Sequence, residues 1–218
     1  MLEQLFSNIL EDLRAATWLE YVAVITGIAS VYFSRLEKIL VYPVGLINTM
    51  IYTYISFIYH LPGEASVNFY YTVMSLYGWY MWMKRNPMKE KYLHISYSDK
   101  KSVIGQLIFF AVIYLIIFFA EIWMEQVFFP GVIPWADALA SATAFTAMWL
   151  MTRKKVESWY WWIATNIASV PLYMVKGLSL TSIYYMILLV VAFFGLSEWK
   201  RRAREAAIAS GSVNARTH

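Results

Sequence analysis

Two tryptophans and an asparagine recur at helical spacing near residue 160. Trp159, Trp162 and Asn166 stand at positions i, i+3 and i+7, so a helix would present them on one face. Flat aromatic rings bind flat ligands and attract cations by about 0.5–2 kcal/mol, whereas an amide both donates and accepts hydrogen bonds. The set fits an uncharged or singly cationic heteroaromatic ligand.

A structural explanation of the same residues is a belt of aromatic side chains at the membrane surface. That explanation suits Tyr160 and Trp161, because Tyr and Trp favour the headgroup level. It does not suit Asn166, which lies ~12 Å along the helix from its charged end. An asparagine at that depth needs a neighbouring helix, water or a ligand as its partner, so an interhelical bond is the alternative to ligand binding.

The composition indicates that membrane helices hold these residues in place. Of 218 residues, 60% are hydrophobic and 15% are charged, against about 25% charged in ordinary soluble domains. A crossing takes about 20 apolar residues. The chain is therefore predicted to be an all-α integral membrane protein with seven transmembrane helices, near 17–34, 40–60, 64–83, 102–121, 135–152, 158–176 and 179–199. Residues 1–16 are predicted to form an amphipathic helix at the membrane surface.

The distribution of Lys and Arg predicts the orientation. All but two of them fall on one side of the seven spans, and the exceptions are Arg14 and Lys176. Basic loops stay in the cytoplasm, so the N-terminus is predicted outside and the C-terminus inside. The net charge of +4 then reflects topology and contact with anionic lipid headgroups, and nothing indicates a nucleic-acid partner.

The chain matches itself when it is shifted by 117 residues. Aligned pairs include Trp18 with Trp135, Lys38 with Lys155, Gly78 with Gly195, and Trp82 with Trp199. Three spans, a connector and three more spans make a parallel 3-1-3 repeat, an arrangement that occurs in the SWEET sugar transporters. The predicted parts are a repeat at 17–85, a connector with linking helix 4 at 86–134, a repeat at 135–202 and a cytoplasmic tail at 203–218.

The first repeat holds its own amide, Asn48, at a similar depth, so two half-sites are predicted to face one axis. Polar and aromatic residues of the third and seventh spans complete the candidate lining of a substrate site: Asn68, Tyr71, Ser75 and Tyr77, with Tyr184 and Tyr185.

Several function classes are disfavoured by what the spans lack. There is no cysteine, no cluster of metal ligands and no phosphate-binding loop, so no cofactor, metal or ATP-driven step is expected. No nucleophile–base pair points to an enzyme. A retinal pigment, among seven-helix receptors, would need a lysine in the middle of the last span. Span centres also lack Asp, Glu and His, the usual ion relays. Facilitated diffusion of an unphosphorylated ligand fits best.

Four segments resemble the PnuC-type vitamin transporter family: LEKILVYPVGLIN, SLYGWYMW, WADALASATAFTAMWLMTRKKVESWYWW and the W-x-x-W-x-x-x-N pattern of Trp159, Trp162 and Asn166. The resemblance implies a full-length SWEET-like fold, commonly trimeric, in a bacterial inner membrane. It implies that these three residues contact the vitamin. It also implies that unphosphorylated vitamin is released and then trapped by an intracellular vitamin kinase.

The substrate stays open at this level. Nicotinamide riboside is expected first. Ser75 and Phe194 stand where nicotinamide riboside transporters often carry asparagine, which favours thiamine as the second candidate. Riboflavin is the third.

Overall fold

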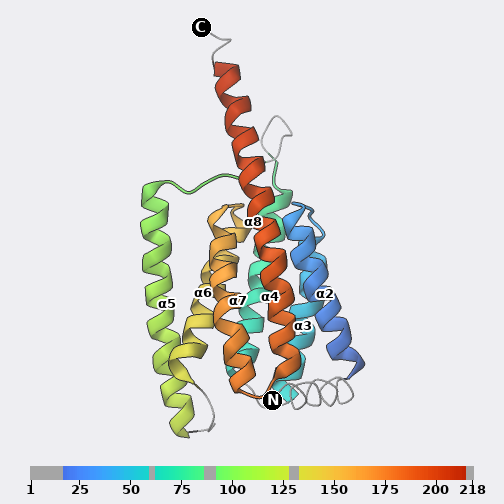
Figure 1. Cartoon of the computed structure of the whole chain (residues 1–218), viewed down its shortest axis with the longest axis vertical. Coiled ribbons are helices and arrows are strands. Elements are labelled where there is room, and N and C mark those ends of the chain that lie inside the picture. The colour runs from blue at the N-terminus through green and yellow to red at the C-terminus, as the bar shows by residue number, and fades with distance from the viewer. Residues whose placement is uncertain (1–16, 59–61, 86–91, 128–132, 215–218) are drawn as a thin grey trace.

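Helices account for nearly all of the chain that the structure describes. The computed structural model describes residues 17–58, 62–85, 92–127 and 133–214. Figure 1 shows the helices side by side along the long axis of the molecule, and their bounds are α2 (Trp18–Arg35), α3 (Val41–Ile58), α4 (Pro62–Met83), α5 (Lys100–Val127), α6 (Pro134–Thr152), α7 (Glu157–Val175) and α8 (Ser179–Asn214). The predicted all-α fold is confirmed. The amphipathic helix predicted at 1–16 lies outside the described residues.

The first helix of each repeat begins with a carboxylate that accepts a hydrogen bond from a backbone N–H at the helix start. In α2, Thr17 and Glu20 form a capping box, in which the Thr17 backbone N–H donates to Glu20 Oε2 at 2.5 Å. In α6, the Ile133 backbone N–H donates to Asp137 Oδ2 at 2.9 Å. Each carboxylate satisfies a backbone donor that helix geometry leaves unpaired. Glu20 and Asp137 are 117 positions apart, so the repeat extends to its helix caps.

The last helix is longer than its predicted span, which ended at 199. Helix α8 continues to Asn214 and leaves the bundle, as Figure 1 shows. Arg201 pairs with Glu198 and Glu205, and Arg202 pairs with Glu198, at spacings of three and four residues. Such pairs stabilise an exposed helix. The predicted span was shorter because it was drawn from hydropathy, which falls where the charged residues begin. The start of the tail at 203 stays a prediction.

Six helices form a closed ring. Helix α2 packs on α3, α3 on α4, α4 on α6, α6 on α7, α7 on α8, and α8 returns to α2. Helix α5 packs on α6 outside the ring and stands at the edge of the bundle in Figure 1. Side chains of these six helices that are not neighbours in the ring therefore meet only in its interior.

Residues 117 positions apart touch each other inside this ring. The Ser34 hydroxyl lies 3.0 Å from Met151 Sδ, and Lys154 Nζ lies 2.6 Å from Glu37 Oε1. The Trp82 and Trp199 ring centroids are 6.2 Å apart. A residue can touch its own counterpart only near the axis that relates the two repeats. All three contacts lie at one end of the bundle, so the axis that relates the two repeats passes through that end, which is consistent with a parallel repeat.

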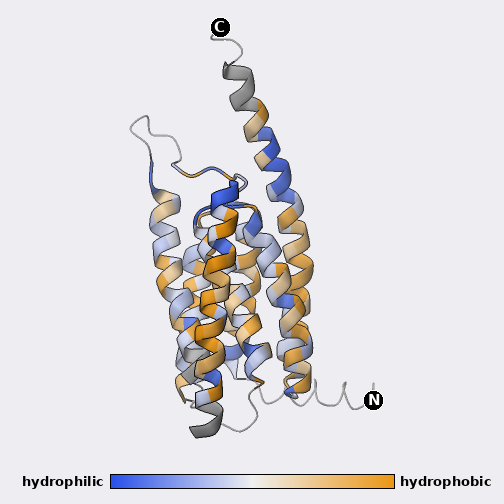
Figure 2. Cartoon of the chain, turned by 90° about the vertical axis from the view of Figure 1, so that its left-hand side faces the viewer, coloured by the Kyte–Doolittle hydropathy of each residue, from blue (hydrophilic) through white to orange (hydrophobic). Residues whose placement is uncertain are grey.

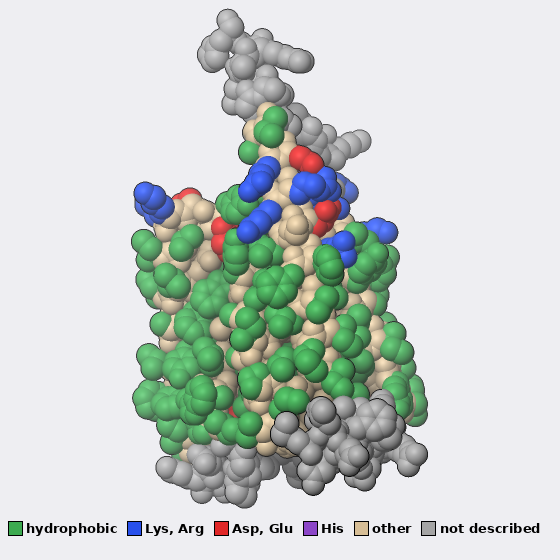
Figure 3. All heavy atoms as spheres, in the orientation of Figure 1, with side chains coloured by type: hydrophobic (Ala, Val, Ile, Leu, Met, Phe, Trp, Pro, Cys, Tyr) green, Lys and Arg blue, Asp and Glu red, His purple; other side chains and the backbone are tan. Residues whose placement is uncertain are grey.

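The end where these contacts lie is also the end where the cations gather. Figure 3 shows Lys and Arg at the top of the bundle and apolar side chains below them, and Figure 2 shows the same division by hydropathy. We call this the basic end. Among the described residues, Val41–Ile58, Lys100–Trp123 and Ser179–Ile208 are long and apolar enough to cross a membrane by length and hydropathy alone.

A connector crosses the basic end between α4 and α5. The Ser96 backbone pairs with Lys154 and Val156, and the Ser98 hydroxyl donates to Glu157 Oε2 at 3.0 Å. Gln106 of α5 continues this network, because its amide donates to Ser98 Oγ at 2.7 Å. The connector is thus tied to the start of α7.

Trp161 corrects one prediction. Its Nε1 lies 3.4 Å from Gln106 Oε1, and its ring packs 5.0 Å from the Phe110 ring, so it joins α7 to α5 and does not serve as a lipid-facing belt residue. Tyr160 is exposed, and its belt position stays a prediction. In the predicted linking helix 4, which is α5, Gln106 stands out as a polar residue near the basic end, but the sequence does not identify Trp161 as its partner.

Candidate ligand-binding site

The interior face of α7 carries a buried residue, Asn166, whose amide has no hydrogen-bond partner among the described residues. Asn166 is 2% exposed, and its carboxamide makes no hydrogen bond to any residue in the described part of the chain. Neighbouring Thr165 is different, because its hydroxyl is 3.0 Å from the hydroxyl of Thr143. Buried amides are almost always paired. Asn166 is therefore the residue of this face that has hydrogen-bonding capacity left for a ligand.

Aromatic rings stand beside this amide. Trp162, one turn from Asn166, has its ring centroid 6.2 Å from that of Tyr71 on α4, across the ring of helices. Tyr71 lies within electrostatic reach of Tyr184 and Tyr185 of α8. Three helices therefore bring Trp162, Tyr71 and the tyrosine pair to one region, as predicted for the lining.

Asn48 joins the same region from the first repeat. Its Nδ2 donates to the Ala23 backbone oxygen at 2.6 Å, so this amide is partly satisfied. A Cβ atom at Gly27 would collide with both the Tyr184 hydroxyl and the Asn48 amide. The absence of a side chain at Gly27 thus lets residues of α3 and α8 meet over α2.

Helix α4 divides the remaining predicted residues. Asn68, Tyr71 and Ser75 follow one another at helical spacing on the inward face, and Ser75 is buried. Tyr77 is 39% exposed and lies with Val73 and Leu76 on the outward face. The structure does not bring Tyr77 together with the other candidates.

Trp159 lies closer to the basic end than the other candidates. Its ring is fully buried and meets the Trp199 ring edge-on, with centroids 5.6 Å apart. In the first repeat, Tyr42 meets Trp82 in the same way at 5.1 Å. We call Tyr42, Trp82, Trp159 and Trp199 the aromatic tetrad. Gly78 and Gly195 make room for it, since a Cβ at either position would collide with the Tyr42 or Trp159 ring.

The sequence analysis missed Tyr42, although the shift of 117 residues places it on Trp159. It also missed a tie between the repeats: the Tyr70 ring stacks on Phe145 with centroids 3.9 Å apart, and its hydroxyl donates to the Phe145 backbone oxygen at 3.1 Å. Tyr70 belongs to the polar and aromatic residues of the third span, but no sequence signal paired it with Phe145, because the repeat equivalents of this pair are Ile28 and Ile187.

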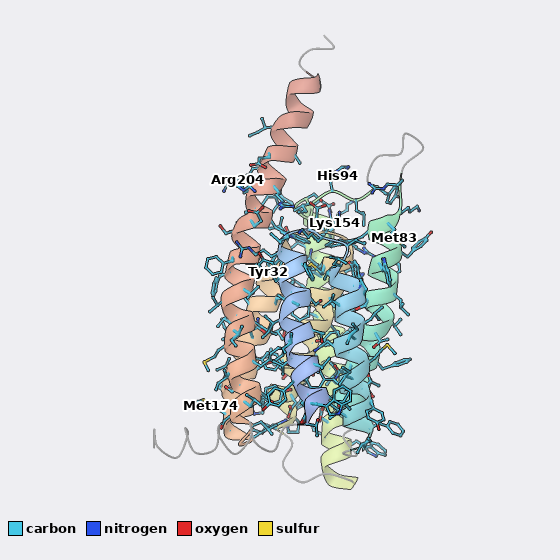
Figure 4. The ribbon with its side chains drawn as sticks, turned by 90° about the vertical axis from the view of Figure 1, so that its right-hand side faces the viewer. Tyr32, Met83, His94, Lys154, Met174 and Arg204 are labelled. Carbon is cyan, nitrogen blue, oxygen red and sulfur yellow. The ribbon has the colours of Figure 1, made fainter. Side chains whose placement is uncertain are left out.

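Charge is confined to the two ends of the bundle among the described residues. Lys154, Glu37 and Arg202 cluster at the basic end, and Lys176 pairs with Asp137 at the other. Figure 4 places Lys154 near the basic end and Met174 near the opposite end. The region around Asn166 therefore offers aromatic rings, hydroxyls and amides, and no described side chain there can neutralise a phosphate.

Residues 17–201 match the model of the family described as nicotinamide mononucleotide transporter. The chain belongs to this family. It is 28% identical over 212 residues to the nicotinamide riboside transporter PnuC of Escherichia coli (strain K12), a match that covers 87% of each chain. It is also 23% identical over 193 residues to the riboflavin/roseoflavin transporter RibM of Streptomyces davaonensis, covering 86% of each.

A solved structure supports the fold. The crystal structure of the vitamin B3 transporter PnuC superimposes with a TM-score of 0.68 at 22% sequence identity, covering 94% of this chain and 90% of that chain. The family resemblance predicted from the sequence is confirmed, and the chain is a multi-pass membrane protein of a transporter family.

Proposed function

We propose that the protein carries an unphosphorylated vitamin across the membrane, with nicotinamide riboside as the main substrate. The observation that carries the proposal is the unpaired Asn166 amide beside the Trp162 and Tyr71 rings. A carboxamide-bearing pyridine ring can stack on such rings while its polar group pairs with Asn166. Relatives named as nicotinamide riboside transporters support the same substrate.

The family description names the mononucleotide, but the site favours the riboside. A phosphate carries about two negative charges at neutral pH and is bound through Arg, Lys or a helix N-terminus. No described Lys or Arg lies near Asn166, and the buried Lys154 is already paired with Glu37. Transfer of an unpaired phosphate into this interior would be strongly unfavourable.

Thiamine remains the second candidate, because the tyrosine-rich lining suits a cationic ring. The structure weakens one argument for it. Phe194 is 54% exposed, so an asparagine missing at this position removes no inward contact. Ser75 is buried and lies on the inward face. Its replacement of the asparagine that nicotinamide riboside transporters often carry is therefore the difference that bears on ribose recognition. Riboflavin is the third candidate, because the relative RibM is named as a riboflavin/roseoflavin transporter.

Transport is proposed to be facilitated diffusion, with an intracellular vitamin kinase trapping the product. The middle of the bundle is free of charged side chains in the described helices, which supports this, since ion-coupled carriers place ionisable groups there. The basic end is proposed to face the cytoplasm of a bacterial inner membrane, by the positive-inside rule. Proteolytic access to α8 in sealed vesicles of known orientation tests that side.

A homotrimer is proposed as the assembly. Helix α5 leaves a large apolar face uncovered by its own chain, on which Leu107, Leu115 and Phe119 are exposed. Such a face contacts either lipid or neighbouring copies. A mass of three chains per particle in mild detergent is the expected result, and a monomer would overturn it.

Ligand titration tests the proposed substrate. The ten tryptophans provide a fluorescence signal, and we expect quenching by nicotinamide riboside at the lowest concentration, followed by thiamine. Nicotinamide mononucleotide is expected to bind at least about 10-fold more weakly, because its phosphate has no partner. Tighter binding of the mononucleotide than of the riboside would overturn the proposal.

A further inference from the structure

The aromatic tetrad holds three buried polar atoms without partners. The Tyr42 hydroxyl, Trp82 Nε1 and Trp159 Nε1 have no hydrogen-bond partner among the described residues. Among the side-chain nitrogen and oxygen atoms of the described part that are completely enclosed, the only other one without a partner is Arg35 Nε; the Asn166 carboxamide does not belong to this completely enclosed set. Native proteins leave few such atoms, because each one loses its bonds to water on burial. Three unpaired polar atoms in one cluster of four rings indicate that these atoms have a role other than stabilising the fold.

The fourth ring shows what a structural role looks like. Trp199 Nε1 donates to the Ser34 backbone oxygen at 3.1 Å. Trp82 is the repeat counterpart of Trp199, yet its N–H has no such acceptor, and Lys154 Nζ lies over the ring at 4.6 Å. The two indoles occupy equivalent positions in the two repeats, but only the Trp199 N–H donates a hydrogen bond within the described protein.

The tetrad lies between the candidate site and the basic end. Trp159 and Asn166 are on the same face of α7, seven residues or ~10 Å apart, with Trp159 nearer the basic end. The Trp82 and Trp199 rings meet across the interior at this level, with centroids 6.2 Å apart. A ligand released from Asn166 toward the basic end must pass these rings.

We infer that Tyr42 and Trp82 are further ligand-contacting residues, which form a second binding position on the path from Asn166 to the basic end. This inference rests on the proposed function. When the tetrad opens, its rings stack on the heteroaromatic part of the ligand. The Trp82 N–H can only donate, so it binds an acceptor oxygen of the ligand, either the carboxamide oxygen or the ribose 5′-hydroxyl oxygen, and the Tyr42 hydroxyl binds beside it.

Conservative ring substitutions test the inference. Tyr42→Phe and Trp82→Phe each remove one unpaired polar atom and keep an aromatic ring. Nicotinamide riboside transport into liposomes should slow roughly 3- to 10-fold, which is the range for one lost hydrogen bond. Equilibrium binding should stay within about twofold, because the resting ligand contacts Asn166.

Trp199→Phe is the matched control. It removes the same volume as Trp82→Phe, but it also removes the bond to Ser34. The melting temperature of Trp82→Phe should therefore stay above that of Trp199→Phe. Equal melting temperatures would show that the Trp82 N–H is paired in the fold, and would overturn the inference.

Ligand analogues separate a binding position from a simple barrier. Transport of nicotinamide riboside is compared with analogues that lack the carboxamide or the ribose 5′-hydroxyl. The slowing by Trp82→Phe should shrink for the analogue that lacks the bonded oxygen. Equal slowing of all three ligands, or wild-type rates in both variants, would overturn the inference. A wild-type protein that transports none of them would overturn the proposed function instead.

Discussion

Replacing Asn166 with leucine is expected to weaken nicotinamide riboside binding by about 10- to 100-fold without loss of thermal stability. The lost affinity corresponds to the hydrogen bonds of a buried amide, roughly 1–3 kcal/mol. Stability is retained because the Asn166 carboxamide makes no hydrogen bond within the described protein, and leucine has a similar volume. Calorimetric titration and a melting curve measure the two effects separately.

Asn48→Leu is the matched control for this prediction. It is the same substitution at an amide that already donates to the Ala23 oxygen at 2.6 Å, so it is expected to lower the melting temperature. An Asn166→Leu protein that binds nicotinamide riboside with wild-type affinity, or that loses as much stability as Asn48→Leu, would show that Asn166 serves only to hold helices together.

Breaking the ion pair between Glu37 and Lys154 is expected to cost about 3–5 kcal/mol of unfolding free energy. Lys154 is 2% exposed and Glu37 is its partner at 2.6 Å, so removing one charge leaves the other buried and uncompensated. Lys154→Met and Glu37→Gln should each destabilise strongly. Because Arg202 also contacts Glu37, the loss of Lys154 leaves part of that charge compensated.

The double variant distinguishes this account from a general packing defect. Lys154→Met with Glu37→Gln should cost clearly less than the sum of the single losses, since neither unpaired charge then remains. Removing the exposed pair of Arg201 and Glu205 should change stability by less than about 1 kcal/mol. Strict additivity of the two buried substitutions would contradict an ion pair at this position.

Much of the fold could be predicted from the sequence, because a membrane helix needs a long apolar run and basic residues mark the loops. The predicted ends of α2, α3, α6 and α7 lie within two residues of the observed ones. The end of α8 was missed, because ion pairs continue the helix beyond the apolar stretch. The repeat was visible in a few pairs, and contact between counterparts such as Ser34 and Met151 now gives it a physical basis.

The site could be predicted only in part. Helical spacing placed Trp162 and Asn166 on one face, but spacing cannot tell which face of α4 turns inward, so Tyr77 was included with Tyr71. Partners of a side chain are equally invisible in a sequence. Asn48 and Asn166 looked alike until the structure showed that one amide is paired and the other is not.

Uptake by proteoliposomes tests the central claim most directly. Purified protein is reconstituted, labelled nicotinamide riboside is supplied outside, and an ionophore is present or absent. We expect the internal concentration to reach the external one and stop there, with the ionophore having no effect. An enclosed nicotinamide riboside kinase with ATP should then drive accumulation of phosphorylated product. Accumulation above the external level without the kinase, or equally fast uptake of the mononucleotide, would contradict the account.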